Sequence, residues 1–279
     1  MKTIILGAKG MLAQDLASVF KEEDPLLMDK EDLDITDEKQ VRKMVFDLKP
    51  DLILNAAAYT DVDRAEDEKE TAFKINGEAV GFLAKAAAET GAILVHFSTD
   101  YVFEGDKEDG YKEDKESRNP INIYGASKLI GEKEILKTKN LKYYLVRISW
   151  LFGPAGKRGQ YKNFVNTIIK LAGEKDELKV IDDQLGKPTY TLDVAKAIKD
   201  LIKHQAPFGV YHLPNEPWTS WYNFAKKIVE IKGLKTKVTP CSSKEFVRKA
   251  KRPKYSILLN TRLSPQRNWE ETLKEYLYD

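Results

Sequence analysis

The stretch Thr3-Ile4-Ile5-Leu6-Gly7-Ala8-Lys9-Gly10-Met11-Leu12-Ala13 decides the fold of this chain. It begins with an apolar run that is too short for a helix and predicts a buried strand. The G-x-x-G-x-x-A turn that follows opens a helix over Met11 to Phe20. Gly7 permits the tight turn, Gly10 lets a ligand approach the backbone, and the final alanine keeps helix and strand close. A helix that begins at such a turn presents free N–H groups and is suited to bind a phosphate.

Short apolar runs alternate with helical patterns through the first half of the chain. Leu26 to Met28 and Leu52 to Leu54 are typical of strands. Between them, Glu38 to Leu48 carries apolar residues at i, i+3, i+4 and i+7, which is the spacing of one helix face. A long helix over Thr71 to Thr90 and a strand over Ala92 to Phe97 continue the series. This order predicts βαβ units and an α/β fold with a doubly wound parallel sheet of the Rossmann type.

The pattern changes after Trp150, which predicts a second unit. Helices there mix with short strands at Lys179 to Ile181 and Val210 to Leu213, and prolines interrupt the series. We expect residues 1–152 with about 190–214 to form the dinucleotide-binding domain. Residues from about 153 to 189, together with 215–279, are expected to form a smaller C-terminal α/β domain for the substrate.

The composition excludes several classes of protein. Among 279 residues, 46 Lys and Arg against 44 Asp and Glu leave a net charge of +2, too little to hold nucleic acid as a main partner. One cysteine, Cys241, excludes a thiolate-clustered metal site. No run of 18 apolar residues is present, and the start lacks a signal peptide, so we expect no membrane partner and a cytoplasmic protein.

An acidic residue stands where a dinucleotide would present its adenosine ribose. Asp29 ends the second strand about 20 residues after the glycine turn, where a carboxylate binds ribose hydroxyls. This charge favours NADH because it repels a 2′-phosphate, whereas Lys9 and Lys30 can pair with that phosphate. The cofactor is therefore NADPH or NADH, and Asp34 and Ile35 would lie next toward the adenine.

The residues that carry the chemistry form a Y-x-x-x-K pair. Tyr124 and Lys128 are spaced i, i+4 and share a helix face, so the lysine ammonium is expected to lie beneath the phenol and lower its pKa. About 25 residues earlier, Ser98 to Phe103 ends the fourth strand, and its Thr99 hydroxyl can hydrogen-bond a substrate carbonyl. Small residues at Asn55 to Ala58 leave room for a flat cofactor. The combination predicts a reductase with a tyrosine general acid.

At this point the sequence resembles the extended short-chain dehydrogenase/reductases, and within them the reductases of dTDP-linked 4-keto-6-deoxy sugars. The similarity runs through almost the whole chain. It rests on the glycine turn, Asn55 to Thr60 with Val62, Asp63, Ala65 and Glu66, Ser98 to Phe103, Asn122 to Gly125 with Lys128, Arg147 to Trp150, Asp183 to Thr189, Gly209 to Leu213, and Arg252 and Pro253 with Ser256.

The resemblance implies roles for these residues. Tyr124 would be the proton donor, Lys128 would orient the nicotinamide ribose and tune Tyr124, and Thr99 would complete the triad. The reaction would reduce the C4 ketone of dTDP-4-dehydro-L-rhamnose to dTDP-L-rhamnose. The resemblance allows a homodimer, and we predict no metal site. The cofactor would contact Gly7, Gly10, Met11, Leu12, Asp29, Asp34, Ile35, Ala58, Tyr59, Thr60, Tyr124 and Lys128, and the sugar nucleotide would contact Thr99, Asp100, Tyr101, Trp150 and Arg252.

Two alternatives remain open. One is a reductase or epimerase that acts on another nucleotide sugar. The other is a non-catalytic regulatory subunit resembling that of methionine adenosyltransferase. The sequence favours a packed, non-catalytic role for His96, because Tyr124 already fills the role of the acid.

Overall fold

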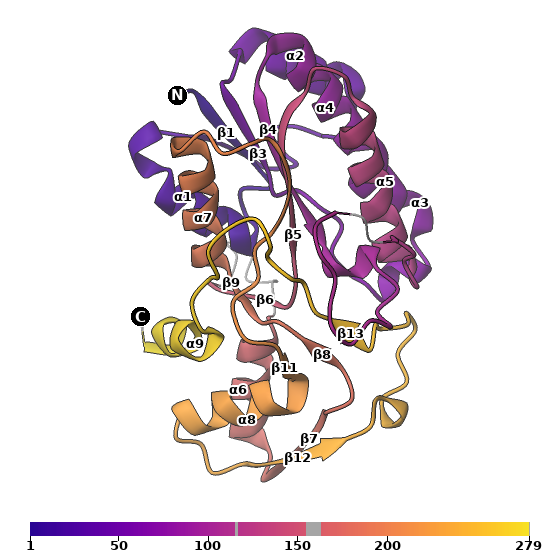
Figure 1. Ribbon diagram of the computed structural model, residues 1–279, viewed down its shortest axis with the longest axis vertical. Helices are drawn as coiled ribbons and strands as arrows, with labels where there is room; N and C mark the ends of the chain where they lie inside the picture. The colour runs from indigo at the N-terminus through magenta and orange to yellow at the C-terminus, as the bar shows by residue number, and fades with distance from the viewer. Residues whose placement is uncertain (115–116, 155–162, 279) are drawn as a thin grey trace.

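The computed structural model describes residues 1–114, 117–154 and 163–278 (Figure 1). Its centre is a six-stranded parallel sheet in the order β10-β5-β4-β3-β1-β2. The strands are β1 (Thr3–Leu6), β2 (Leu26–Met28), β3 (Leu52–Asn55), β4 (Ile93–Thr99), β5 (Lys142–Ile148) and β10 (Gly209–His212). This arrangement confirms the predicted doubly wound α/β fold.

The sheet is buried on both faces, which explains why its strands are continuously apolar. Ile4 points to one face with the helices α2 (Glu38–Leu48), α4 (Ala79–Thr90) and α5 (Ile123–Lys137). Ile5 points to the other face with α1 (Met11–Val19) and α7 (Thr191–Lys203). Figure 1 shows these helices on opposite sides of the strands. The order reverses at β1, because β2 lies on one side of it and β3 on the other. Ligands bind at such a switch point, beyond the carboxyl ends of the strands.

The helix predicted over Thr71 to Thr90 begins earlier and is not uniform. It starts as α3 (Lys69–Phe73), continues through a π-helical turn over Lys74–Glu78, and ends as α4. The extra residue of the π turn places the amide of Asn76 between two other segments. Its Nδ2 donates to the Ser127 hydroxyl of α5 at 3.0 Å, and its Oδ1 accepts from the Tyr59 backbone at 2.9 Å. The sequence pattern identified the helix but gave no sign of this turn.

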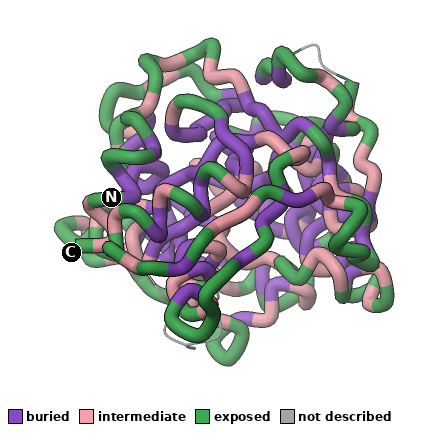
Figure 2. The backbone as a smooth tube through the Cα atoms, turned by 90° about the horizontal axis from the view of Figure 1, so that it is seen from below, coloured by how far each residue is buried: buried purple, intermediate pink, exposed green. Residues whose placement is uncertain are grey.

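The remaining elements form a smaller layer with a core of its own, seen below the sheet in Figure 1. Phe152, Val165, Phe224 and Trp269 are among its buried residues. Figure 2 shows the buried residues inside and the exposed ones around the outside. The elements outside the central sheet domain are β6 (Leu151–Phe152), α6 (Phe164–Glu174), β7 (Glu177–Ile181), β8 (Leu185–Gly186), β9 (Thr189–Tyr190), β11 (Thr219–Ser220), α8 (Trp221–Ile231), β12 (Lys237–Cys241), β13 (Tyr255–Ser256) and α9 (Trp269–Tyr278).

Short helical turns complete the chain: η1 (Lys21–Glu23), η2 (Arg64–Glu66), η4 (Asp100–Val102) and η5 (Ser243–Glu245). No helix in the described ranges is both long enough and apolar enough to cross a membrane.

Candidate active site

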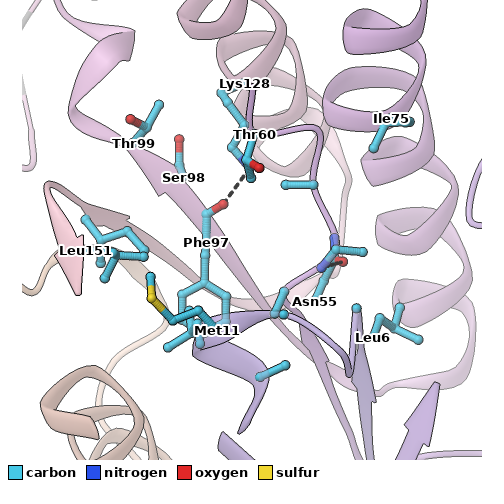
Figure 3. Close-up of a pocket in the computed structure, with 18 of the residues that line it drawn as sticks. Leu6, Met11, Asn55, Thr60, Ile75, Phe97, Ser98, Thr99, Lys128 and Leu151 are labelled. Carbon is cyan, nitrogen blue, oxygen red and sulfur yellow. Dashed lines mark hydrogen bonds between the residues drawn. The ribbon is translucent and has the colours of Figure 1, made fainter. Parts of the chain in front are cut away.

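A cavity of about 920 Å³ opens at the carboxyl ends of the central strands (Figure 3). Its size is at the upper end of the range for small-molecule sites. Fourteen of the predicted site residues line it: Gly7, Gly10, Met11, Leu12, Asp29, Asp34, Ile35, Ala58, Thr60, Thr99, Asp100, Tyr124, Lys128 and Trp150.

The glycine turn forms one end of this cavity. Gly7 has φ +74°, and a Cβ there would lie 2.7 Å from the Ala57 backbone nitrogen, so no other residue fits without moving the segment that follows β3. Gly10 is the N-cap of α1 and gives the helix no side-chain cap. The first N–H groups of α1 therefore face the cavity without a capping side chain, as a pyrophosphate requires.

Asp29 lies at the end of β2, where the sequence predicted an adenosine ribose. Its carboxylate accepts hydrogen bonds from the backbone N–H groups of Lys9 at 2.9 Å and Lys30 at 2.7 Å, which fix its position. The Lys9 ammonium pairs with Glu31 at 2.8 Å. Nearby, the Asp34 carboxylate accepts from the Thr36 N–H and hydroxyl, and these bonds lower its pKa. The residues of this end fit a dinucleotide.

The reacting end is formed by Thr99, Asp100 and Tyr124. The Thr99 hydroxyl donates to Asp100 Oδ1 at 2.9 Å, while Asp100 Oδ2 is buried with no hydrogen-bond partner among the described residues. Burial raises the pKa of Asp100 to about 6, and the hydroxyls of Ser256 and Thr99 offset part of that rise. Burial and the Asp100 charge raise the pKa of Tyr124 well above its usual value. Tyr124 therefore keeps its proton at neutral pH, as a proton donor must.

Lys128 does not lower the pKa of Tyr124 in this structure, so that expectation was wrong. Its ammonium group turns toward β4 and donates to the Phe97 carbonyl at 2.6 Å (Figure 3). Its Nζ also lies 3.3 Å from His96 Nε2. Burial lowers the pKa of Lys128 to about 8, and the Glu132 charge opposes this shift. Lys128 lies on the same helix face as Tyr124 and reaches the cavity, as predicted. Its ammonium group, however, bonds to β4.

An aromatic wall closes the cavity on the C-terminal side. The Trp150 and Trp221 rings stack with centroids 3.5 Å apart and an interplanar angle of 11°, and Phe164 packs against Trp221. Gly186 lies against the Trp150 ring, where a Cβ would approach to 2.4 Å. Trp221 packs against the core around Phe224 and also lines the cavity.

Three predicted site residues lie outside the cavity lining: Tyr59, Tyr101 and Arg252. Tyr59 donates its phenol to Glu68 at 2.9 Å, and burial with this bond raises its pKa to about 12. The Tyr101 ring meets Tyr124 edge-on, with centroids 5.9 Å apart.

Arg252 belongs to a cluster of charges that we call the clamp, formed by Asp63 and Asp67 on one side and Lys249, Ala250 and Arg252 on the other. Arg252 donates to both carboxylate oxygens of Asp63, at 3.1 and 2.8 Å. The Ala250 N–H also donates to Asp63 at 3.1 Å, and Lys249 pairs with Asp67. The clamp joins the segment after β12 to the segment after β3.

Sequence reasoning missed part of the lining. Glu70, Thr71, Lys74 and Ile75 reach the cavity from the first turns of the helix that begins at Lys69. In the sequence these residues look like part of an ordinary helix. Their place beside the cavity becomes visible only in the structure, where Asn76 of the π turn binds the Tyr59 backbone. Within the described ranges, no group of three or more His, Cys, Asp or Glu side chains is arranged to hold a metal.

The whole chain, residues 1–279, matches the model of one protein family, the RmlD substrate binding domain. The chain belongs to this family. One curated relative, the spore coat polysaccharide biosynthesis protein SpsK of Bacillus subtilis, is 38% identical over 100% of this chain and 97% of its own length. Another is the dTDP-4-dehydrorhamnose reductase of Streptomyces griseus, 36% identical over 98% of this chain and 91% of its own length.

A crystal structure of an RmlD-type enzyme is also similar. It is the dTDP-4-dehydrorhamnose reductase of Bacillus anthracis in complex with NADP, with a TM-score of 0.93 and 42% identity over 99% of both chains. The resemblance that the sequence indicated is therefore confirmed at the level of the RmlD family.

Proposed function

We propose that this protein is an NAD(P)H-dependent oxidoreductase that reduces the C4 ketone of dTDP-4-dehydro-L-rhamnose to dTDP-L-rhamnose. The observation that carries the proposal is that Thr99, Tyr124 and Lys128 line the same cavity as the glycine turn. Relatives that match this chain over nearly its full length are named dTDP-4-dehydrorhamnose reductase. We further propose that it acts in the cytoplasm, where NAD(P)H is supplied.

The cofactor would be held by the residues of the first two strand ends. The α1 N-terminus after Gly10 would bind the pyrophosphate, Asp29 the adenosine ribose, and Asp34 and Ile35 the region of the adenine. Ala58, Tyr59 and Thr60 would flank the nicotinamide half. When bound, the nicotinamide supplies the hydride.

The chain's own residues would handle the proton. Tyr124 holds a proton on its phenol oxygen and gives it to the alkoxide that forms at C4. Thr99, whose hydroxyl donates to Asp100 in the ligand-free protein, would turn that hydroxyl to the same oxygen and help to orient the ketone. Lys128 would hold the nicotinamide ribose. Asp100, Tyr101, Trp150 and Arg252 are proposed to contact the sugar nucleotide.

The division into two domains is part of the proposal. Residues 1–152 with about 190–214 would bind the cofactor, and residues from about 153 to 189 with 215–279 would bind the nucleotide sugar. Support comes from the buried core around Val165 and Phe224, and from the pairing of β10 with β5 in the central sheet. Residues 155–162, near the boundary, lie outside the described part of the chain.

The test is oxidation of NADPH and NADH at 340 nm with dTDP-4-dehydro-L-rhamnose made in situ, beside a UDP-linked 4-keto sugar. Turnover with the dTDP substrate alone supports the proposal. Turnover with the UDP sugar instead would favour the alternative reductase or epimerase. Cofactor binding without turnover of either would favour the regulatory subunit, for which co-purification with methionine adenosyltransferase is the second measurement. Sedimentation equilibrium tests the homodimer.

A further inference from the structure

His96 is a buried titratable group that the proposed reaction does not use. It lies on β4, three residues before Thr99, and its side chain is fully buried. Its Nδ1 lies 3.0 Å from Asn55 Nδ2, and its Nε2 lies 3.3 Å from Lys128 Nζ. His96 therefore stands between a residue of the cofactor cavity and the lysine of the reacting end.

The hydrogen bonds of Asn55 determine which imidazole nitrogen carries the proton. The Ala57 backbone N–H donates to Asn55 Oδ1 at 3.2 Å, which fixes the amide with its Nδ2 toward His96. An amide nitrogen only donates, so His96 Nδ1 must accept. Burial lowers the pKa of His96 well below its usual value, so the ring is neutral. The single ring proton is then on Nε2, which faces Lys128.

This arrangement opposes the charged form of Lys128. An ammonium group has three N–H donors and no acceptor, so it cannot bond to an N–H. An unprotonated amine has a lone pair that can accept from His96 Nε2 while one of its own N–H bonds donates to the Phe97 carbonyl at 2.6 Å. The contact between His96 and Lys128 is thus a hydrogen bond only when Lys128 is neutral.

We propose that His96, oriented by Asn55, is a positioning residue that donates its Nε2 proton to the Lys128 amine and so stabilises neutral Lys128 in the ligand-free protein. A bond to the neutral form of a base disfavours its charged form. The low pKa of Lys128, about 8 against an ordinary 10.5, agrees with this direction through burial. The bearing on catalysis rests on the proposed function, in which Lys128 holds the nicotinamide ribose beside Tyr124.

Other ionisable groups lie on the elements packed around α5, and one of them opposes the effect. Glu132 raises the pKa of Lys128, but its carboxylate is bound by Arg147 at 2.9 and 2.8 Å. Among the ionisable groups on these elements are Tyr124 and Glu132 on α5, His96 on β4, Asp100 on η4, Arg147 on β5 and Lys74 on the π turn. The proposal therefore concerns a lysine whose nearest carboxylate is already neutralised.

The experiment is an NMR titration of ligand-free protein labelled with ¹³C at the lysine side chains. Lys128→Met identifies the signal of Lys128. We expect it to titrate near pH 8 in the unmodified protein, and about one pH unit or more higher in His96→Gln, whose side-chain carbonyl can accept from the ammonium. An ordinary lysine titration in the unmodified protein, or an unchanged or lower one in His96→Gln, would overturn the proposal.

A second variant tests the tautomer without removing His96. Asn55→Asp places an acceptor against His96 Nδ1, so the proton moves there and Nε2 presents a lone pair to Lys128. We expect an upward shift of the Lys128 titration that is larger than the shift caused by Asn55→Asp in a His96→Leu background. Equal shifts in both backgrounds would show a direct effect of the new charge and refute the relay through His96.

The titration needs no substrate, so it decides this inference even if the protein proves not to be the proposed reductase. Where turnover is found, the midpoint of the pH profile of kcat adds a readout that simple packing would not move. We expect that midpoint to shift in the same direction as the Lys128 titration in both variants.

Discussion

At the scale of single residues, the proposed chemistry depends on the Tyr124 proton. Tyr124→Phe keeps the ring at the cavity wall but removes the proton donor, so kcat should fall by roughly 10² or more. The cofactor dissociation constant, measured by fluorescence titration, should remain nearly unchanged. A variant that retains full turnover would remove Tyr124 from the role of acid.

Asp29 should decide between the two cofactors. Its carboxylate also accepts two backbone hydrogen bonds, so Asp29→Asn is a milder change than Asp29→Ala. Both variants should weaken NADH more than NADPH, because the ribose hydroxyls lose their charged acceptor and a 2′-phosphate loses a repulsive neighbour. Titration with each cofactor measures the two losses, and equal losses would place the ribose elsewhere.

Asp100 should make stability depend on pH. Its pKa of about 6 lies above the ordinary 3.8, so its contribution to stability is present below about pH 4 and is lost as the pH rises through 6. Asp100→Asn avoids that loss and should gain up to about 3 kcal/mol relative to the unmodified protein between pH 4 and 7. Thermal denaturation of both proteins across this range is the measurement. A constant difference in melting temperature would contradict the shifted pKa.

At the scale of elements, the turn between β1 and α1 depends on its first glycine. Gly7→Ala should destabilise the protein by about 2 kcal/mol or more, because a Cβ adds a clash with the Ala57 backbone to the cost of a positive φ. Gly91→Ala is the matched control: φ there is +78°, but nothing lies within 4 Å of the added Cβ. It should cost about 1 kcal/mol. Urea denaturation compares the two, and similar losses would mean that the close approach to Ala57 does not contribute to stability.

The elements that the sequence predicted well are those with a periodic pattern. The strand at Ile4 and the helix face carrying Val41 and Val45 follow directly from apolar spacing, and the cavity end near Gly7 follows from the turn. The π turn at Asn76 could not be predicted, because it results from contacts with Tyr59 and Ser127 that are distant in sequence. For the same reason the sequence placed Lys128 at the site but missed its bond to β4.

At the scale of the whole molecule, the clamp joins the two layers. Asp63→Ala leaves the guanidinium of Arg252, whose side chain is 14% exposed, without its partner, and should cost about 2 kcal/mol or more. Asp67→Ala removes an exposed ion pair with Lys249 and should cost less than about 1 kcal/mol. Urea denaturation of both variants, at low and high salt, measures the difference. Equal losses of stability in the two variants would show that burial of Arg252 does not make its ion pair with Asp63 more important than the exposed pair of Asp67 and Lys249.

The return of the chain to the central sheet has a consequence for synthesis on the ribosome. α7 covers one face of the sheet, and β10 covers the edge of β5. Both are translated after β6, α6, β7, β8 and β9, which follow Trp150 in the chain. At 5–20 residues per second, this leaves roughly 3 to 12 s in which the face that carries Val95 and Val146 lacks α7. During that interval the nascent chain contains an incomplete sheet with exposed apolar side chains. A ribosome that stalls near residue 190 would therefore present an intermediate that is prone to aggregate.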